Sequence, residues 1–164
     1  MRVLGIDPGT LATGYGVVCD ASGVLRNITH GVIRTNAKHP LWKRLKVIHD
    51  GIAEVIEATQ PEIMSIEQCF VGKNIQSALK LGHARGVAML AGVTRGLSVV
   101  EFTPGQIKQA VTGRGRADKH QVSEMVRIIL TLERKAAEDA SDALAAAICQ
   151  LNTRHLEGRL EAAR

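Results

Sequence analysis

The chain has 164 residues and a formal net charge of +5, a length typical of a single folded domain. Hydrophobic residues make up 45% of the chain and aromatic residues only 2%, so an aliphatic core is expected and a low-complexity chain is excluded. No apolar run approaches the ~20 residues of a transmembrane helix, and no signal peptide is expected at the start. The positive charge suits a polyanionic partner, although it is also compatible with a simple role in solubility.

Hydrophobic periodicity and turn residues predict ten elements along the chain. Strands are expected at 2–6, 13–19, 24–34, 62–67 and 97–102, and helices from about residue 40, then at 74–95, 105–112, 118–131 and 139–152. The turn at Ala21-Ser22-Gly23 makes the second and third strands an antiparallel hairpin. A hairpin followed by alternating strands and helices predicts an α/β fold, with a five-stranded mixed sheet flanked by helices. We expect one domain over 1–152 and a polar, flexible tail over 153–164.

The three cysteines, Cys19, Cys69 and Cys149, are far apart and lack the spacing of metal ligands. Free thiols are therefore expected, and they are typical of a reducing compartment. Together with the absence of a membrane span, this predicts a cytoplasmic protein.

Acidic residues stand at positions where the expected elements end or begin. Asp7 ends the first strand, Glu67 ends the fourth, and Asp139 and Asp142 share one face of the last helix. In open α/β sheets, functional groups gather at the carboxyl ends of the strands. Converging carboxylates are suitable ligands for Mg²⁺ ions that cleave a phosphodiester. Alternatively, Asp7 initiates a turn, and the two aspartates of the helix complement its dipole.

Four segments resemble the motifs of bacterial RuvC Holliday-junction resolvases. LGIDPGTLATGYGVV at the start is similar to the first motif, and IEQCFVGKNIQSALKLGHARGVA (66–88) is similar to the second and most specific. IKQAVTGRGRADKHQV (107–122) and DASDALAAAIC (139–149) resemble the other two. The resemblance runs in order over residues 1–151.

This resemblance implies a ribonuclease H-like fold and a homodimer that nicks two opposing strands of a four-way DNA junction symmetrically. It assigns the acidic tetrad of the family to Asp7, Glu67, Asp139 and Asp142. These residues would bind two Mg²⁺ ions, with Mn²⁺ as a substitute and Asp7 as the ligand shared by both ions. It also implies the RuvAB branch-migration complex as a partner.

Candidate DNA contacts lie in two regions, and each has a structural alternative. Phe70 follows Glu67 and resembles a residue that inserts near the junction centre, but a phenylalanine in a loop core is the alternative. The basic and polar candidates are Lys73, Asn74, Lys108, Arg114, Arg116 and Lys119. Asn74 can instead cap a helix, and Arg114 and Arg116 can simply be solvated.

Other readings remain open from the residues alone. The stripe Ala78-Gly82-Gly86 permits close packing within the monomer, the reading that the sequence favours, whereas the resemblance implies a dimer contact. GIDPGT also resembles the phosphate loop of actin-like phosphotransferases, although those proteins need two such domains. A non-catalytic junction-binding module and a ribonuclease that cuts RNA–DNA hybrids are further alternatives on the same fold.

Overall fold

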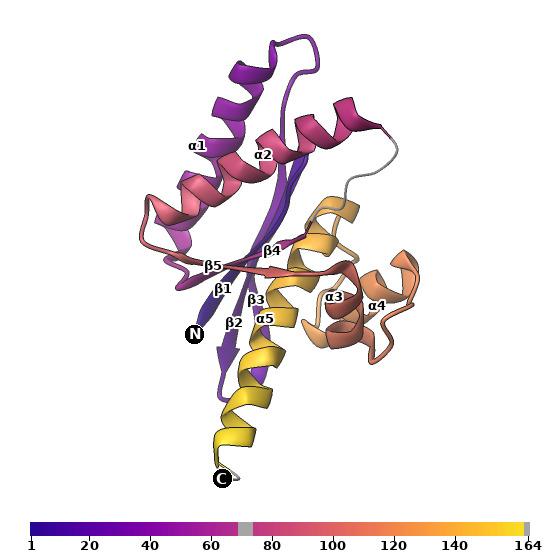
Figure 1. Ribbon diagram of the computed structural model, residues 1–164. Coiled ribbons are helices and arrows are strands. Elements are labelled where there is room, and N and C mark those ends of the chain that lie inside the picture. Colours follow the sequence, from indigo (N-terminus) through magenta and orange to yellow (C-terminus); the bar gives the residue numbers. More distant parts are fainter. Residues whose placement is uncertain (69–73, 163–164) are drawn as a thin grey trace.

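A computed structural model describes residues 1–68 and 74–162, which form one five-stranded sheet and five helices (Figure 1). The strands are β1 (Arg2–Asp7), β2 (Ala12–Ala21), β3 (Val24–Arg34), β4 (Ile63–Glu67) and β5 (Ser98–Phe102). The helices are α1 (Leu41–Thr59), α2 (Ile75–Val93), α3 (Pro104–Thr112), α4 (Lys119–Ile129) and α5 (Glu138–Ala162). The strand order is β3-β2-β1-β4-β5. β1, β2 and β3 pair antiparallel, whereas β1, β4 and β5 pair parallel, which confirms the predicted mixed sheet.

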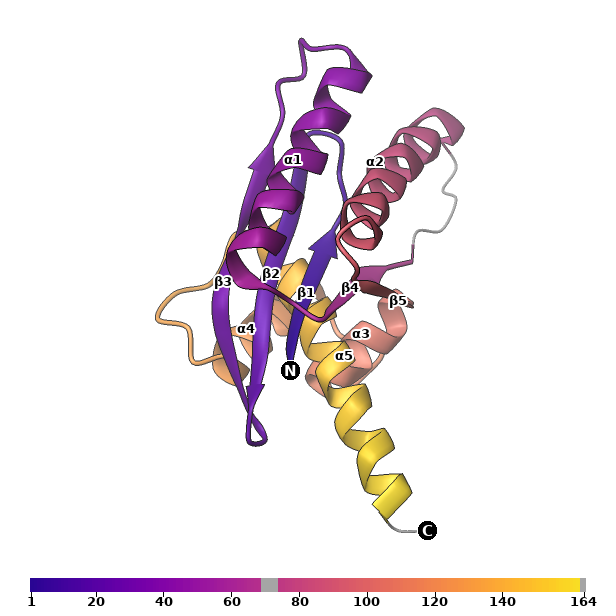
Figure 2. The same cartoon turned by 90° about the vertical axis from the view of Figure 1, so that its left-hand side faces the viewer.

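Helices cover both faces of the sheet, and each face has its own hydrophobic core. Figure 2 shows α1 and α2 in front of the sheet and α3, α4 and α5 behind it. The core under α1 and α2 is built from side chains such as Leu4, Ile52 and Met64. The core under α5 includes Val3, Leu144 and Ile148. Apolar residues on both sides of β1 explain why its run of buried positions is continuous rather than alternating.

Helix α5 lies in backbone contact with the sheet because small residues separate the two. A Cβ atom at Gly5 would overlap the backbone oxygen of Ala143, and one at Gly14 would overlap the backbone oxygen of Asp139. The Ser65 hydroxyl donates a hydrogen bond of 2.7 Å to the backbone oxygen of Ala146. This close approach fixes the height of the first turns of α5 above the ends of β1 and β2.

The last helix is longer than predicted. It continues to Ala162 instead of ending near residue 152, so residues 153–162 are helical. This segment consists mainly of good helix formers, among them Leu156 and Leu160 one turn apart. His155 Nε2 lies 2.6 Å from Asp20 Oδ2 and ties the start of the extension to β2. Beyond this contact the helix projects from the body of the molecule (Figure 1).

The small-residue stripe of α2 does not pack within the monomer, so the reading that the sequence favoured is wrong. A Cβ atom at Gly82 or Gly86 would meet no described atom within 4 Å. Together with Ile75, Leu79 and Leu90, these glycines line an apolar groove of about 620 Å³ on the surface. Among the described residues, packing within the monomer therefore does not explain why these positions are small.

Two of the cysteines can be placed, and both are free. Cys149 is buried in α5, and Cys19 is half-buried in β2; Cys69 lies outside the described residues. Among residues 1–68 and 74–162, no helix is both long enough and apolar enough to cross a membrane.

Candidate active site

Asp7 and Glu67 stand side by side at one edge of the sheet. Asp7 is the last residue of β1 and Glu67 the last residue of β4. The two strands are parallel neighbours, and Ile6 pairs with Ile66, so the next residue of each strand reaches the same edge. Parallel pairing therefore brings together two carboxylates that are 60 positions apart in the sequence, as the strand ends predict.

Helix α5 brings a third carboxylate to this edge. Asp7 pairs with Gly14 across β1 and β2, and the backbone of Asp139 rests directly on Gly14. Asp142 follows within the next turn and faces a cleft of about 290 Å³. The cleft is lined by Asp7, Glu67, Pro104, Ile107, Lys108, Lys119, Val122, Asp142 and Ala145. The structure thus gathers Asp7, Glu67 and Asp142, whereas Asp139 is half-buried beside them and does not line the cleft.

The cleft carries more negative charge than its surroundings compensate. Burial, followed by the charges of Asp142, Glu67 and Asp139, raises the pKa of Asp7 to about 7. Burial likewise raises the pKa values of Glu67 and Asp142. Desolvation and like charges both disfavour the ionised carboxylate, so a cation in the cleft would stabilise the ionised form.

Two lysines supply part of that positive charge. Lys108 on α3 and Lys119 at the start of α4 both line the cleft. Lys119 Nζ lies 3.4 Å from Asp142 Oδ2 and 2.7 Å from Glu138 Oε1. The hydrogen bond from Lys119 lowers the pKa of Glu138. Sequence reasoning missed Glu138, although its position next to Asp139 at the start of a helix offered a signal.

The carboxylates share one cleft but are not grouped as ligands of a single ion. Within the described part of the chain, no group of three Asp, Glu, His or Cys side chains is positioned to hold a metal ion. Like charges repel one another, and the Lys119 ammonium lies against Asp142 in this state. The donor set nevertheless consists of hard oxygen ligands, which Mg²⁺ prefers.

The turn that follows Asp7 is held from three sides. The buried Thr13 hydroxyl donates to the backbone oxygen of Gly9 at 2.8 Å. The Thr35 hydroxyl and the Arg44 guanidinium both donate to the backbone oxygen of Thr10, each at 2.6 Å. These bonds fix the chain immediately after Asp7 and so limit the movement of its carboxylate.

Arg85 fixes the backbone of Glu67 from the other face. Its Nε donates to the backbone oxygen of Glu67 at 3.3 Å, and its Nη2 lies 2.7 Å from Glu101 Oε2 on β5. Arg85 therefore connects α2 to the ends of β4 and β5. Sequence reasoning missed this residue; an arginine among the small residues of α2 was the available signal.

Only some of the candidate DNA contacts lie among the described residues. Phe70 and Lys73 lie outside the described residues. Asn74 caps α2, since its side-chain oxygen accepts a hydrogen bond of 3.1 Å from the Ser77 amide. Arg114 and Arg116 are exposed in the connection between α3 and α4, and neither lines the cleft.

Comparisons with known proteins agree on one family. The family described as "Crossover junction endodeoxyribonuclease RuvC" matches residues 3–150. The crossover junction endodeoxyribonuclease RuvC of Syntrophotalea carbinolica is 53% identical over 160 residues, covering 98% of this chain and 99% of that protein. The relative of the same name from Geobacter sulfurreducens is 47% identical over 164 residues and covers both chains fully.

A solved structure of similar extent has the same fold. The RuvC protein of T. thermophilus, in complex with Holliday junction substrate, matches with a TM-score of 0.90 and 33% identity over 96% of each chain. This likeness confirms the predicted ribonuclease H-like fold class. By sequence and by structure, the chain belongs to the RuvC family of crossover junction endodeoxyribonucleases.

Proposed function

We propose that this protein resolves four-way DNA junctions as a homodimer, each copy nicking one of two opposing strands. The observation that carries the proposal is the cleft in which Asp7, Glu67 and Asp142 face Lys108 and Lys119. Carboxylates suit metal-dependent hydrolysis, and lysines suit the phosphate of the substrate. The T. thermophilus relative was solved with Holliday junction substrate, which supports the choice of DNA substrate.

Membership of the family implies a divalent metal cofactor, and we propose two Mg²⁺ ions for each active site, with Mn²⁺ as a substitute. Asp7 would be the shared ligand, with Glu67 and Asp142 completing the two sites and Asp139 orienting ligands. The residues fit this role, because all four side chains offer oxygen ligands, and burial together with the neighbouring carboxylates raises the pKa of Asp7 to about 7. When bound, the metal ions would activate a water molecule and stabilise the leaving oxygen.

The chain's own residues then bind and orient the scissile strand. Phosphate would be repelled from the three carboxylates, so the cationic groups at the mouth of the cleft are needed to draw it in. Lys108 and Lys119 line that mouth from α3 and α4. Glu138 holds the Lys119 ammonium at 2.7 Å and so restricts where its charge points.

The remaining candidate contacts would guide the DNA on either side of the cleft. Arg114 and Arg116 are exposed beside α3 and α4, where they would follow the backbone of the cut strand. For Phe70, Lys73 and Asn74, contacts near the junction centre remain predictions from the family resemblance. The same resemblance supports RuvAB as a partner.

The apolar groove on α2 is the proposed dimer contact. Leu79 and Leu90, which line the groove, are 57% and 55% exposed, and Ile75 is 68% exposed. Gly82 lies in the same groove with open space above it, so a second backbone can approach closely. A two-fold dimer would explain paired incision, since the two equivalent strands of a junction would meet two equivalent clefts.

The test is cleavage of a labelled synthetic four-way junction. Wild-type protein with Mg²⁺ should place symmetric nicks in two opposing strands. Asp7→Asn and Asp142→Asn should bind the junction and leave it intact. Glu157→Gln, an exposed carboxylate on the same helix as Asp142, should cut at the wild-type rate. Equal cutting of linear duplex or of an RNA–DNA hybrid would overturn the resolvase assignment, and an active Asp7→Asn would overturn the metal assignment.

A further inference from the structure

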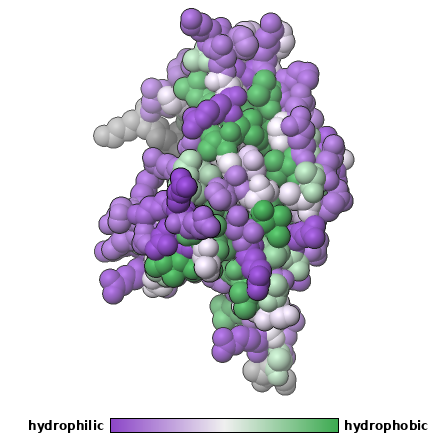
Figure 3. All heavy atoms as spheres, turned by 180° about the vertical axis from the view of Figure 1, so that it is seen from behind, coloured by the Kyte–Doolittle hydropathy of each residue, from purple (hydrophilic) through white to green (hydrophobic). Residues whose placement is uncertain are grey.

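The connection from β3 to α1 forms a basic corner, which we define as residues 34–46. No acidic residue occurs between Asp20 and Asp50. The basic residues in that stretch, histidines aside, are Arg26, Arg34, Lys38, Lys43, Arg44 and Lys46. All except Arg26 fall within the corner. Seen from behind, the end of the molecule that carries this connection is covered mainly by hydrophilic side chains (Figure 3).

The charged residues of α1 are distributed in the opposite sense to the one that the helix dipole favours. The first turn contains no acidic residue and the last turn no basic one, although a helix dipole favours the reverse arrangement. Lys43 lies in the first turn, whereas Asp50, Glu54 and Glu57 lie in the second half. Pro40 at the N-cap also gives no side-chain hydrogen bond. The stability of α1 therefore does not explain why Lys43 lies in its first turn.

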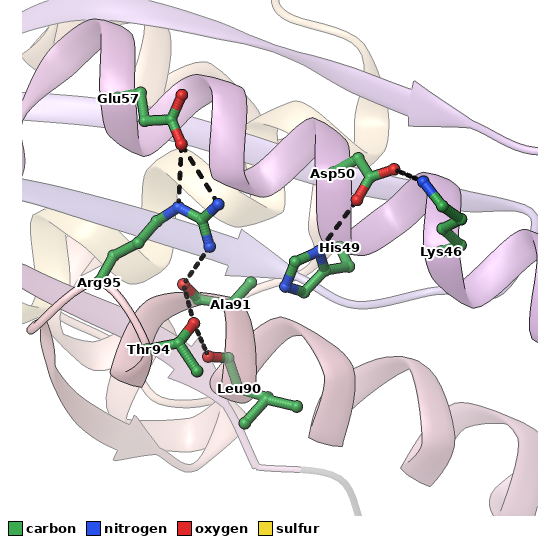
Figure 4. Close-up of polar contacts among 8 residues, drawn as sticks. All are labelled: Lys46, His49, Asp50, Glu57, Leu90, Ala91, Thr94 and Arg95. Atoms are coloured by element: carbon green, nitrogen blue, oxygen red, sulfur yellow. Dashed lines mark hydrogen bonds and ion pairs between the residues drawn. The ribbon is translucent and has the colours of Figure 1, made fainter.

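Contacts within the chain account for only part of this positive charge. Lys46 forms an ion pair with Asp50, as Figure 4 shows. Arg44 is bound to the backbone oxygen of Thr10. In contrast, Arg34, Lys38 and Lys43 are exposed and form no ion pair with any described residue. These three cations are available to a partner.

An exposed tryptophan stands among these cations. Trp42 is 66% exposed and is the only tryptophan of the chain. Lys43 Nζ lies 5.3 Å from the centroid of its ring. An aromatic face flanked by cations is a common arrangement for contacting nucleotides, because the ring stacks on a base or sugar while the cations bind phosphate.

The corner is attached to the active site. Both Thr35 and Arg44 donate to the backbone oxygen of Thr10, which lies in the turn directly after Asp7. Figure 1 places the β3–α1 connection at the same end of the molecule as the start of α2, whereas the β2–β3 hairpin and the C-terminus lie at the opposite end (Figure 2). DNA bound at the corner would therefore be held in a fixed relation to the cleft.

We propose that the basic corner is a second DNA-binding surface, which holds a duplex arm while the scissile strand lies in the cleft. Arg34, Lys38 and Lys43 contact backbone phosphates, and the Trp42 ring packs against a sugar or base of the same arm. The proposal rests on the proposed function for the identity of the nucleic acid. Charge complementarity argues for a polyanion, and continuity with the turn after Asp7 argues for the same DNA that is cut.

The first test compares two double variants that lose the same charge. Lys38→Gln/Lys43→Gln removes cations of the corner. Arg26→Gln/Arg154→Gln removes two exposed arginines near the other end of the molecule. Affinity for a four-way junction is measured in EDTA, which prevents cleavage, over a series of salt concentrations. The corner variant should bind about tenfold or more weakly at 0.1 M salt, with a salt slope shallower by about two. The control should keep the wild-type slope.

A wild-type slope for the corner variant overturns this inference and leaves the proposed function intact, provided that wild-type protein nicks the junction. If wild-type protein binds DNA but does not nick junctions, the proposed function fails. The slope on linear duplex then still decides whether the corner binds DNA. If the true partner of the corner were an acidic protein, the corner variant would bind DNA with the wild-type salt slope, and this inference would be overturned.

Two further measurements separate a binding role from a structural one. Lys43→Glu places an acid in the first turn of α1, so it should raise Tm by favouring the helix dipole while weakening junction binding. A lower Tm with unchanged binding would overturn the role of Lys43. Because Trp42 is the only tryptophan, its fluorescence should be quenched in parallel with binding of unlabelled junction. Unchanged emission at saturation would overturn the role of Trp42.

Discussion

The ammonium group of Lys119 lies 3.4 Å from the carboxylate of Asp142, and both residues line the acidic cleft. The lysine lowers the pKa values of Asp7, Glu67 and Asp142 through its charge. In this state it provides part of the positive charge that the cluster lacks. Because Asp142 would also hold a metal ion, Lys119 and the metal would compete for the same carboxylate.

Lys119→Gln is expected to raise the pKa values of the three cleft carboxylates and to slow cleavage by about a hundredfold, the effect of losing one positioned charge. Carbon NMR titration of metal-free protein and single-turnover nicking measure the two effects. Lys119→Arg keeps the charge and should retain most of both properties. Unshifted carboxylates in Lys119→Gln would show that the ammonium does not act on the cluster.

Metal-free protein is expected to lose stability as the pH rises from about 4 to 7. The folded pKa of Asp7 is about 7 and its ordinary value is 3.8, so the native state binds the proton more tightly. Its contribution falls through this window, by at most about 4 kcal/mol. Asp20, Asp50, Glu124 and Glu138 have lowered pKa values, so their contributions are lost only as the pH falls below about 5.

Thermal melts in EDTA between pH 5 and pH 8 measure this effect. Asp7→Asn should flatten the curve and melt at a higher temperature than wild type at pH 8, although it does not cut DNA. Mg²⁺ should also flatten the wild-type curve, since an ion that binds only the folded state stabilises it. A wild-type Tm that rises from pH 5 to pH 8 in EDTA would contradict the raised pKa of Asp7.

Gly14→Ala is expected to destabilise the protein by about 1–3 kcal/mol, because the added methyl group would push the start of α5 off the sheet. Cleavage should fall more steeply than stability, since Asp142 moves with this helix. Gly158→Ala, which lies on α5 itself, is the matched control. Its methyl group meets no described atom, and it should stabilise the helix by about 1 kcal/mol. Urea unfolding and nicking assays compare the two variants. Full activity in Gly14→Ala would show that the position of Asp142 does not depend on the close contact between α5 and Gly14.

Leu79→Glu is expected to convert the protein to a monomer, because it places a charge in the apolar groove of α2. Leu79 is 57% exposed in the single chain, so folding should be preserved. Leu156→Glu, at a residue that is 59% exposed on α5, should leave the oligomeric state unchanged. Sedimentation equilibrium gives the masses. A Leu79→Glu variant that remains dimeric would show that the dimer interface does not lie on α2.

Strand ends could be predicted from the sequence because short apolar runs and turn residues mark them locally. Asp7 and Glu67 follow such runs, and the rule for parallel sheets was enough to expect them side by side. The family match also removes the phosphotransferase alternative that GIDPGT left open. The end of α5 was misplaced, because polar composition suggested a tail although the segment has good helix propensity.

The partners of the site could not be read from the sequence. The pairing of Glu138 with Lys119 depends on how α4 and α5 pack, and that of Arg85 with Glu101 depends on the position of α2 over β5. Packing of the α2 stripe within the monomer was predicted, but the structure leaves the stripe open, because periodicity identifies a face of a helix but not what covers it. Asp139 illustrates the same limit, since sharing a helix face with Asp142 does not place it in the cleft.

The contact between α5 and the sheet has a consequence for how the enzyme can change. The helix that places Asp142 in the cleft also fills the hydrophobic core with Leu144, Ile148 and Leu151. Catalytic geometry and global folding therefore depend on one continuous segment. Substitutions that loosen this core should slow the enzyme before they unfold it, whereas substitutions of exposed side chains such as Leu79 and Lys43 should leave the geometry of the cleft intact.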